Sequence, residues 1–146
     1  MSNKDESQMS YSERIDFLGH RFALFLNNGG ATVAKNGRIA DLSEGYSVGG
    51  FGPEFRLSDV ASLKELARKG EWMKLGRLYT ALFTVVKATC DDEISHIGFW
   101  VDTETDHLYA DGSKIFLNRN DAMAEGKKRA QLTIYDFAKN VVFKVE

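Results

Sequence analysis

Three aspartates at the ends of predicted strands are the residues of this chain best suited to acid–base or metal chemistry. Asp102, Asp111 and Asp136 each follow a run of apolar or aromatic residues. Carboxylates that converge in a fold can bind a divalent cation or exchange protons with a substrate. An aspartate beside a turn, however, commonly accepts hydrogen bonds from nearby backbone N–H groups. We therefore expect structural roles for all three, with a catalytic cluster as the alternative.

The other reactive residue types lack the spacing that metal binding or nucleophilic catalysis requires. His20 lies on a predicted helix, whereas His96 and His107 lie far apart along a predicted hairpin. Cys90 is the only cysteine, and no zinc-ligand spacing or Cys–His signature connects it with a histidine. The sequence also contains no nucleophile elbow. We therefore predict no catalytic residue, no metal and no cofactor.

The glycine-rich segment 45–52 carries two aromatic residues, Tyr46 and Phe51. It lacks the lysine of a P-loop and the glycine spacing of a dinucleotide-binding turn, so phosphate binding is not expected. Glycine lets a loop reshape around a ligand, and aromatic rings bury large areas on contact. We therefore predict Tyr46 and Phe51 as recognition anchors. The competing interpretation is that both rings fill the core while the glycines form bulges.

A second recognition surface is predicted from Trp100, Tyr109 and Tyr135, which side-chain alternation places side by side on one sheet face. A four-residue turn that pairs Val101 with Leu108 puts Trp100 opposite Tyr109. Trp and Tyr supply large, rigid contact areas. The competing interpretation is that one of two long predicted helices covers this face, because aromatic side chains are usually buried.

Apolar periodicity and turn signals predict the elements that position these residues. Ser10 and Glu13 form a capping box at the start of a helix. Asn36 and Gly37 predict a type I′ hairpin turn within 31–40. Four helices are predicted: 11–27, a short helix capped by Ser58 that ends at Gly70, 71–89, and a helix from Asn118 to about 129. Short irregular strands are predicted around Pro53, within 45–57. The further predicted strands are 96–102, 107–113, 131–137 and 141–145.

The predicted fold is a single α+β domain in which antiparallel sheet packs against about four helices, with a C-terminal ββαββ unit. Residues 1–9 are predicted to be a disordered tail, and 10–146 the domain. In the last unit the helix should present small residues to the sheet, while alternate residues of the next strand point inward. These inward positions are Ala122, Gly126, Ala130, Leu132 and Ile134.

Composition excludes several classes of protein. The chain has 146 residues and a net charge of −2, from 19 basic and 21 acidic residues, which is too balanced for a protein that neutralises nucleic-acid phosphates. Lys127, Lys128 and Arg129 end a predicted helix, where they complement its dipole. The N-terminus has no signal-peptide pattern, and no apolar run is long enough to cross a membrane. With a single cysteine, the sequence predicts a cytoplasmic protein with neither nucleic-acid nor membrane partners.

Several short motifs, in their order along the chain, resemble those of small proteins from bacteriophages and mobile elements. The motifs are Gly29-Gly30-Ala31-Thr32, Gly45-Tyr46-Ser47-Val48, Gly98-Phe99-Trp100-Val101-Asp102, Tyr109-Ala110-Asp111-Gly112-Ser113, Asp121-Ala122 and Ile134-Tyr135-Asp136. This chain departs from the pattern at Asp106, where those proteins often have glycine. The resemblance brings no activity or catalytic residue. It implies a phage-borne accessory protein that acts on a host system.

Two functions are compatible with these observations. The first is a non-catalytic accessory protein that binds a host protein or a small signalling ligand and antagonises a host defence system, with a homo-oligomer as a possible state. The alternative is a small phosphodiester or nucleotide hydrolase that uses the strand-end aspartates and a histidine. Aspartates that converge in a cleft would favour the hydrolase, and aspartates scattered in turns would favour the binding protein.

Overall fold

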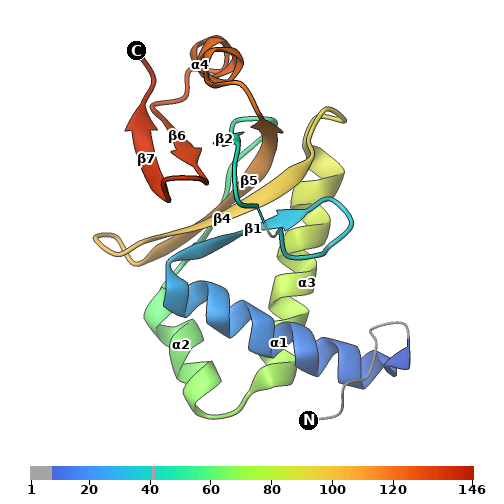
Figure 1. Ribbon diagram of the computed structural model, residues 1–146. Helices are drawn as coiled ribbons and strands as arrows, with labels where there is room; N and C mark the ends of the chain where they lie inside the picture. The colour runs from blue at the N-terminus through green and yellow to red at the C-terminus, as the bar shows by residue number, and fades with distance from the viewer. Residues whose placement is uncertain (1–7, 41) are drawn as a thin grey trace.

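The chain alternates helices and strands in an order that confirms the predicted α+β class. A computed structural model describes residues 8–40 and 42–146, so most of the predicted tail, residues 1–7, lies outside the described residues. In the described residues the elements are α1 (Tyr11–Asn28), β1 (Gly30–Ala34), β2 (Tyr46–Val48), β3 (Phe55–Ser58), α2 (Val60–Arg68), α3 (Trp72–Thr89), β4 (His96–Asp102), β5 (His107–Phe116), α4 (Arg119–Lys128), β6 (Thr133–Asp136) and β7 (Val141–Lys144) (Figure 1).

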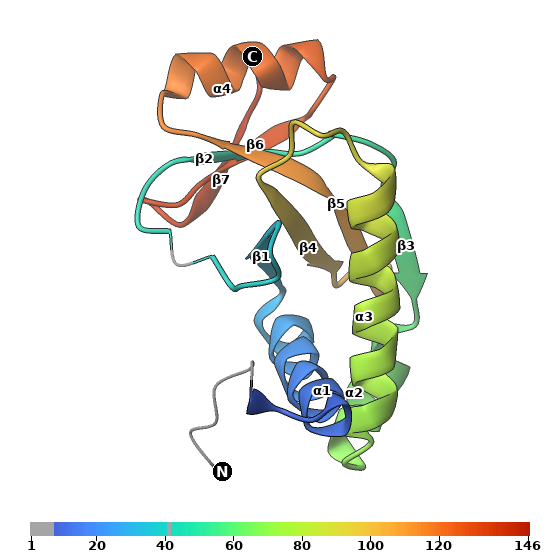
Figure 2. The same ribbon diagram turned by 90° about the vertical axis from the view of Figure 1, so that its right-hand side faces the viewer.

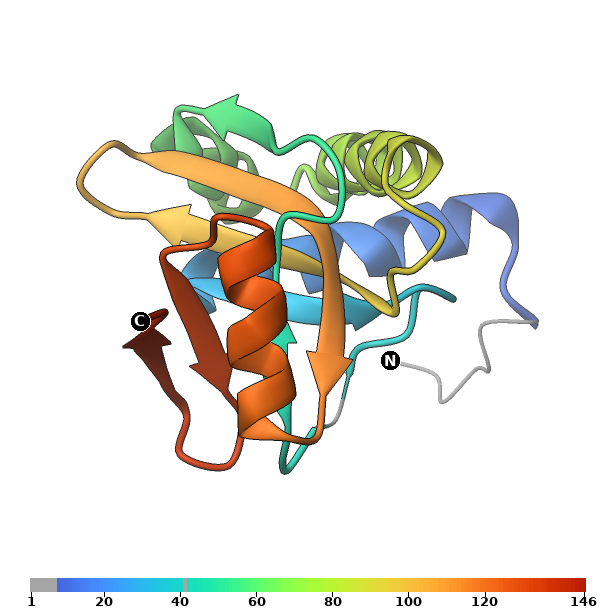
Figure 3. The ribbon, with the colours of Figure 1, turned by 90° about the horizontal axis from the view of Figure 1, so that it is seen from above.

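One antiparallel sheet contains all of these strands, in the order β1-β4-β5-β2-β6-β7, with β3 paired to β5. The long strand β5 joins the two halves of the sheet, because residues 107–113 pair with β4 and residues 114–116 pair with β2. Figure 3 shows β5 turning from the direction of β4 toward that of β2. The predicted C-terminal ββαββ order is present as β4-β5-α4-β6-β7.

Helices α1 and α3 pack against one part of the sheet, and α4 packs against another. Figures 1 and 2 show α1, α2 and α3 together at one end of the molecule and α4 at the opposite end, beyond β2 and β6. The Phe99 ring of β4 lies 5.7 Å from Phe25 of α1 and 5.7 Å from Tyr79 of α3, measured between ring centroids. On the β4–β5 hairpin, the residues that alternate with Trp100 and Tyr109 are all buried: Ile97, Phe99, Val101, Leu108 and Ala110.

Local signals placed the helix ends correctly in two cases and missed a third. The Ser10–Glu13 capping box is present, with both reciprocal N–H···O bonds at 3.2 Å, and Asn118 caps α4 through the Asp121 N–H. The cap of α2 is Asp59, not Ser58. Asp59 has a φ of 63°, and its carboxylate accepts the Ser62 N–H at 3.1 Å, so a charged acceptor fills the position predicted for a hydroxyl.

The turn after β1 is not of type I′. That turn type requires positive φ at both Asn36 and Gly37, but in this turn only Gly37 has it, at 91°. The Gly37 N–H donates to the Ala34 carbonyl at 2.8 Å, and the Ala34 N–H donates to Arg38 at 2.7 Å. The returning segment pairs through a single bridge between Val33 and Ile39, so it does not form a second strand.

Three of the five positions predicted to face inward on α4 and the following strand are correct. Ala122, Gly126 and Ile134 are buried, but Ala130 is exposed and Leu132 is 84% exposed. The helix ends at Lys128, and Ala130 adopts a φ of 55° in the turn that follows. Leu132 therefore lies before the start of β6, and the side-chain alternation that buries Ile134 does not apply to it.

Gly126→Leu should destabilise the protein by roughly 2–3 kcal/mol, because it overfills a packed contact. A Cβ at Gly126 would lie 3.0 Å from Val145 Cγ2 and 3.1 Å from Ile134 Cδ1, so the larger side chain must push α4 off β6. Urea unfolding of the variant measures the loss. Ala124→Leu, on the exposed face of the same helix, should leave stability close to that of the wild type. Equal stability of the two variants would contradict this packing.

Candidate recognition surface

The face of β4 and β5 opposite helices α1 and α3 carries an exposed tryptophan. Trp100 is 59% exposed, and its ring stacks on Tyr109 with centroids 5.5 Å apart and planes 28° apart. The alternation that buries Phe99 and Val101 against the helices turns Trp100 the other way. The interpretation that a long helix covers this face is therefore wrong, because α1 and α3 both pack on the opposite side.

Strand register defines the neighbours of Trp100. Gly30 of β1, Trp100, Tyr109 and Arg56 of β3 lie opposite one another in a row across four strands. In the next row Gly98 lies opposite Asp111. A Cβ at Gly98 would meet no atom closer than Asp111 Oδ1, at 3.6 Å, so the space directly above Gly98 is open. We call Arg56, Gly98, Trp100, Tyr109 and Asp111 the Trp100 surface.

Tyr135 lies outside this surface. It is on β6, where it pairs with Ser47 of β2 and Val142 of β7, and its ring contacts Phe137 with centroids 4.9 Å apart. Because β2 lies between β5 and β6, Tyr135 is not a cross-strand neighbour of Tyr109. The prediction that Trp100, Tyr109 and Tyr135 lie side by side is therefore correct for the first two residues only.

The aromatic residues of the glycine-rich segment pack inward. Phe51 is 0% exposed, so its ring fills the core and cannot contact a partner in this conformation. Tyr46 is half-buried on β2, with its ring centroid 6.0 Å from that of Phe143. For Phe51 the competing interpretation of a core role is confirmed. For Tyr46 a recognition role stays a prediction.

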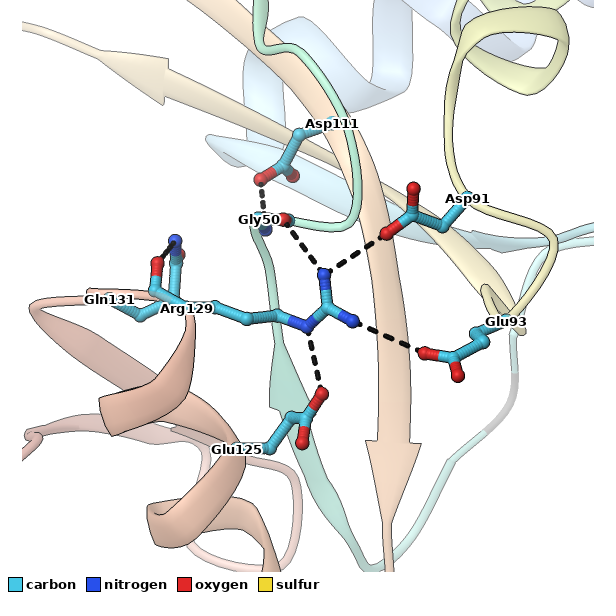
Figure 4. A network of polar contacts seen from close by, with 7 residues as sticks. All are labelled: Gly50, Asp91, Glu93, Asp111, Glu125, Arg129 and Gln131. Carbon is cyan, nitrogen blue, oxygen red and sulfur yellow. Dashed lines mark hydrogen bonds and ion pairs between the residues drawn. The ribbon is translucent and has the colours of Figure 1, made fainter.

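Arg129 organises a polar network that the sequence does not reveal (Figure 4). Its guanidinium lies over the Phe51 ring, 3.4 Å from the centroid, and donates to the Gly50 carbonyl at 3.4 Å. Three carboxylates bind the same group, with N···O distances of 2.8 Å to Glu125, 3.1 Å to Asp91 and 3.2 Å to Glu93. Arg129 thus joins the glycine-rich segment to α4 and to the α3–β4 loop. Its predicted role at the helix terminus misses these contacts.

Two of the three strand-end aspartates have the structural role expected of them. Asp102 accepts hydrogen bonds from the Thr105 hydroxyl at 2.9 Å and the Glu104 N–H at 3.0 Å, and these bonds lower its pKa. Asp136 is buried and accepts the N–H groups of Ala138 and Lys139 at 3.0 and 3.2 Å. Each carboxylate therefore stabilises its own turn.

Asp111 is different, and the expectation of a turn role is wrong for it. It lies within β5, and its Oδ2 accepts the Gly50 N–H at 3.1 Å from a segment 61 residues away. Gly49 allows this approach, because a Cβ there would lie 2.6 Å from Oδ2. Burial raises the pKa of Asp111 to about 6, the Gly50 hydrogen bond opposes the shift, and the nearby Glu54 charge adds to it.

The three aspartates lie at separate positions, with Asp102 at the end of β4, Asp111 within β5 and Asp136 at the end of β6. Within residues 8–40 and 42–146, no group of three or more His, Cys, Asp or Glu side chains is placed to hold a metal ion. The histidines are separate as well: His20 stacks on Trp72 of α3 at 3.9 Å between centroids, whereas His96 and His107 are on β4 and β5.

Two shallow grooves lie on the helical side of the molecule. One, of about 480 Å³, runs between α1 and α3 and is lined by residues that include Tyr11, Ala81 and Val85. The other, of about 500 Å³, lies between α1 and α2 beside the stacked rings of His20 and Trp72. Neither groove includes a residue of the Trp100 surface, so the molecule offers these grooves and the sheet face as separate candidate surfaces.

Comparison of the chain with protein-family models, with curated proteins and with solved structures finds no match. In the part of the chain that the structure describes, no helix is long and apolar enough to cross a membrane. Function is therefore inferred from the chemistry of the site, since a fold class by itself does not specify one.

Proposed function

We propose that this chain is a non-catalytic, phage-like accessory protein that binds a host protein through the Trp100 surface and thereby antagonises a host defence system. The observation that carries the proposal is the exposed, stacked Trp100–Tyr109 pair on a sheet face that the helices leave open. Tryptophan and tyrosine are the residues most enriched among those that dominate binding energy in protein interfaces. The resemblance to proteins of bacteriophages supports a site of action in the bacterial cytoplasm.

A protein partner fits this face better than a small signalling ligand does. Small-molecule sites are usually concave and bury most of the ligand. Trp100 instead lies on an open strand pair, with more than half of its surface accessible at 59% exposure. A second copy of the chain is a rival occupant, and the oligomeric state measured in solution by light scattering distinguishes it from a host protein.

Trp100→Ala should abolish capture of the host partner without loss of stability. Truncation of a central aromatic residue typically costs 2 kcal/mol or more, which corresponds to roughly a 30-fold loss of affinity. Affinity capture from host lysate, followed by mass spectrometry of proteins and co-purified metabolites, measures the effect. Leu132→Ala is the matched control, because Leu132 is 84% exposed and lies outside the surface. Equal capture by both variants would reject the proposal.

A further inference from the structure

A partly exposed carboxylate, that of Asp111, lies on the same sheet face as Trp100. Asp111 is two residues from Tyr109 on the same face of β5, and it is diagonal to Trp100 across the strand pair. Its Oδ2 is bound to the Gly50 N–H, whereas among the described residues Oδ1 has no hydrogen-bond partner. Oδ1 is the atom nearest to the open position at Gly98, and Asp111 is partly exposed. One oxygen is therefore held in place and the other is available to a ligand.

The charges around this position favour a cation. Glu54 is close enough to Asp111 to act on it electrostatically, which adds a second negative charge. Arg56 lies on the far side of Tyr109, in the row of Trp100, and the Arg129 guanidinium is bound by three carboxylates on the other side of Gly50 (Figure 4). A positive group above Gly98 would lie beside Asp111 Oδ1 and two residues along β4 from Trp100, and an indole ring is the best side chain for cation–π attraction.

We propose that the Trp100 surface binds the lysine or arginine side chain of a flexible segment of the partner protein; this inference rests on the proposed function. The cationic group of that side chain lies above Gly98, between Trp100 and Asp111. The open face argues for a side chain rather than a free organic cation, because the rest of the segment can supply contacts that an enclosed cavity would give to a small ligand. The raised pKa of Asp111 agrees with this assignment: burial is its main cause, the Glu54 charge adds to it, and a cation bound beside the carboxylate would oppose both effects.

NMR titration tests the assignment directly, because Trp100 and Trp72 give separate indole N–H signals. The probes are N-acetyl-arginine methylamide and N-acetyl-lysine methylamide, with neutral N-acetyl-norleucine methylamide as the matched control. We expect saturable shifts of the Trp100 indole and the Gly98 amide with at least one cationic probe, no saturation with norleucine, and no shift of Trp72, which stacks on His20 in the helical layer. Absence of saturation with both cationic probes overturns the proposal.

Substitutions identify the side chains that bind the cationic probe. Asp111→Asn should weaken binding of the cationic probe at least fivefold, and Trp100→Ala at least tenfold. Asp16→Asn, which removes the same charge from α1 on the opposite side of the sheet, should have no effect. Arg56→Gln should increase affinity for the cationic probe, because it removes a positive charge from the Trp100 surface, whereas a loss of affinity would indicate an anionic ligand and overturn the assignment. Unchanged binding by Asp111→Asn, or tighter binding of tetramethylammonium than of either amino-acid probe, would overturn the assignment.

The same variants separate this inference from the proposed function. If Trp100→Ala loses the captured host protein while Asp111→Asn retains it, the surface is a recognition site and the basic side chain is excluded. If both variants retain the host protein, the recognition role of the surface fails as well. Loss in both variants, with retention in Asp16→Asn, supports both proposals.

Discussion

Gly76→Ala should destabilise the protein by about 3 kcal/mol or more, because no side chain fits where α1 crosses α3. A Cβ at Gly76 would lie 1.9 Å from the Ile15 carbonyl oxygen, and a Cβ at Gly19 would lie 1.9 Å from the Trp72 carbonyl oxygen. Both obstacles are backbone atoms of the facing helix, so the helices themselves must separate. We expect the same loss for Gly19→Ala. Thermal and urea unfolding measure both variants.

Intrinsic propensity predicts the opposite sign for these two substitutions. Alanine is favoured over glycine inside a helix by about 1 kcal/mol, so an unobstructed Gly→Ala change would stabilise α1 or α3. The matched control is Gly98→Ala on β4, where the nearest atom to the new Cβ is 3.6 Å away. The control should unfold at nearly the wild-type temperature. Stabilisation by Gly76→Ala would show that the helices do not approach so closely.

Asp111→Asn should stabilise the protein at pH 7 by roughly 2–3 kcal/mol. Burial raises the pKa of Asp111 from 3.8 to about 6, so the folded protein binds a proton more tightly than the unfolded chain does. Proton binding at Asp111 therefore adds to the free energy of unfolding. This contribution is fully present below about pH 4 and is lost as pH rises through about 6. A difference of about two pKa units between the folded and unfolded protein changes the free energy of unfolding by roughly 3 kcal/mol. Asparagine carries no charge, and its side-chain oxygen can still accept the Gly50 N–H.

The pH dependence distinguishes this effect from a change in packing. Unfolding free energies of wild type and Asp111→Asn should be similar at pH 4 and diverge between pH 4 and 6, with the variant more stable. Asp102→Asn is the control of opposite sign, because turn hydrogen bonds lower the pKa of Asp102, and the variant should lose stability near neutral pH. A stability gain in Asp111→Asn that does not change with pH would contradict the assigned cause.

The sequence predicted those features that short-range rules determine. The Val101–Leu108 register follows from turn length and side-chain alternation, and the capping box at Ser10 follows from two residues three positions apart. The same rules failed at Leu132, because the turn that contains Ala130 delays the start of β6 to Thr133. Local patterns therefore give the elements, while their exact ends depend on backbone conformation that the patterns do not specify.

The candidate site could be predicted only in part, because its features depend on contacts between distant segments. Trp100 and Tyr109 were placed together correctly, but the alternation does not reveal which face of β4 the helices cover. Phe51 and Trp100 were both predicted as recognition residues, each with burial as the competing interpretation, and only the packing shows that Phe51 is buried and Trp100 exposed. The contacts of Asp111 with Gly50 and of Arg129 with Asp91 span 61 and 38 residues, so no local signal could have shown them.

The most direct test of the Trp100 surface is hydroxyl-radical footprinting of the protein alone and in complex with its captured host partner. In the free protein Trp100, at 59% exposure, should be oxidised readily. The complex should protect Trp100 and Tyr109, while oxidation of Leu132 and of Val85, in the groove between α1 and α3, stays unchanged. Undiminished oxidation of Trp100 together with protection of Val85 would contradict the account and place recognition on the helical side.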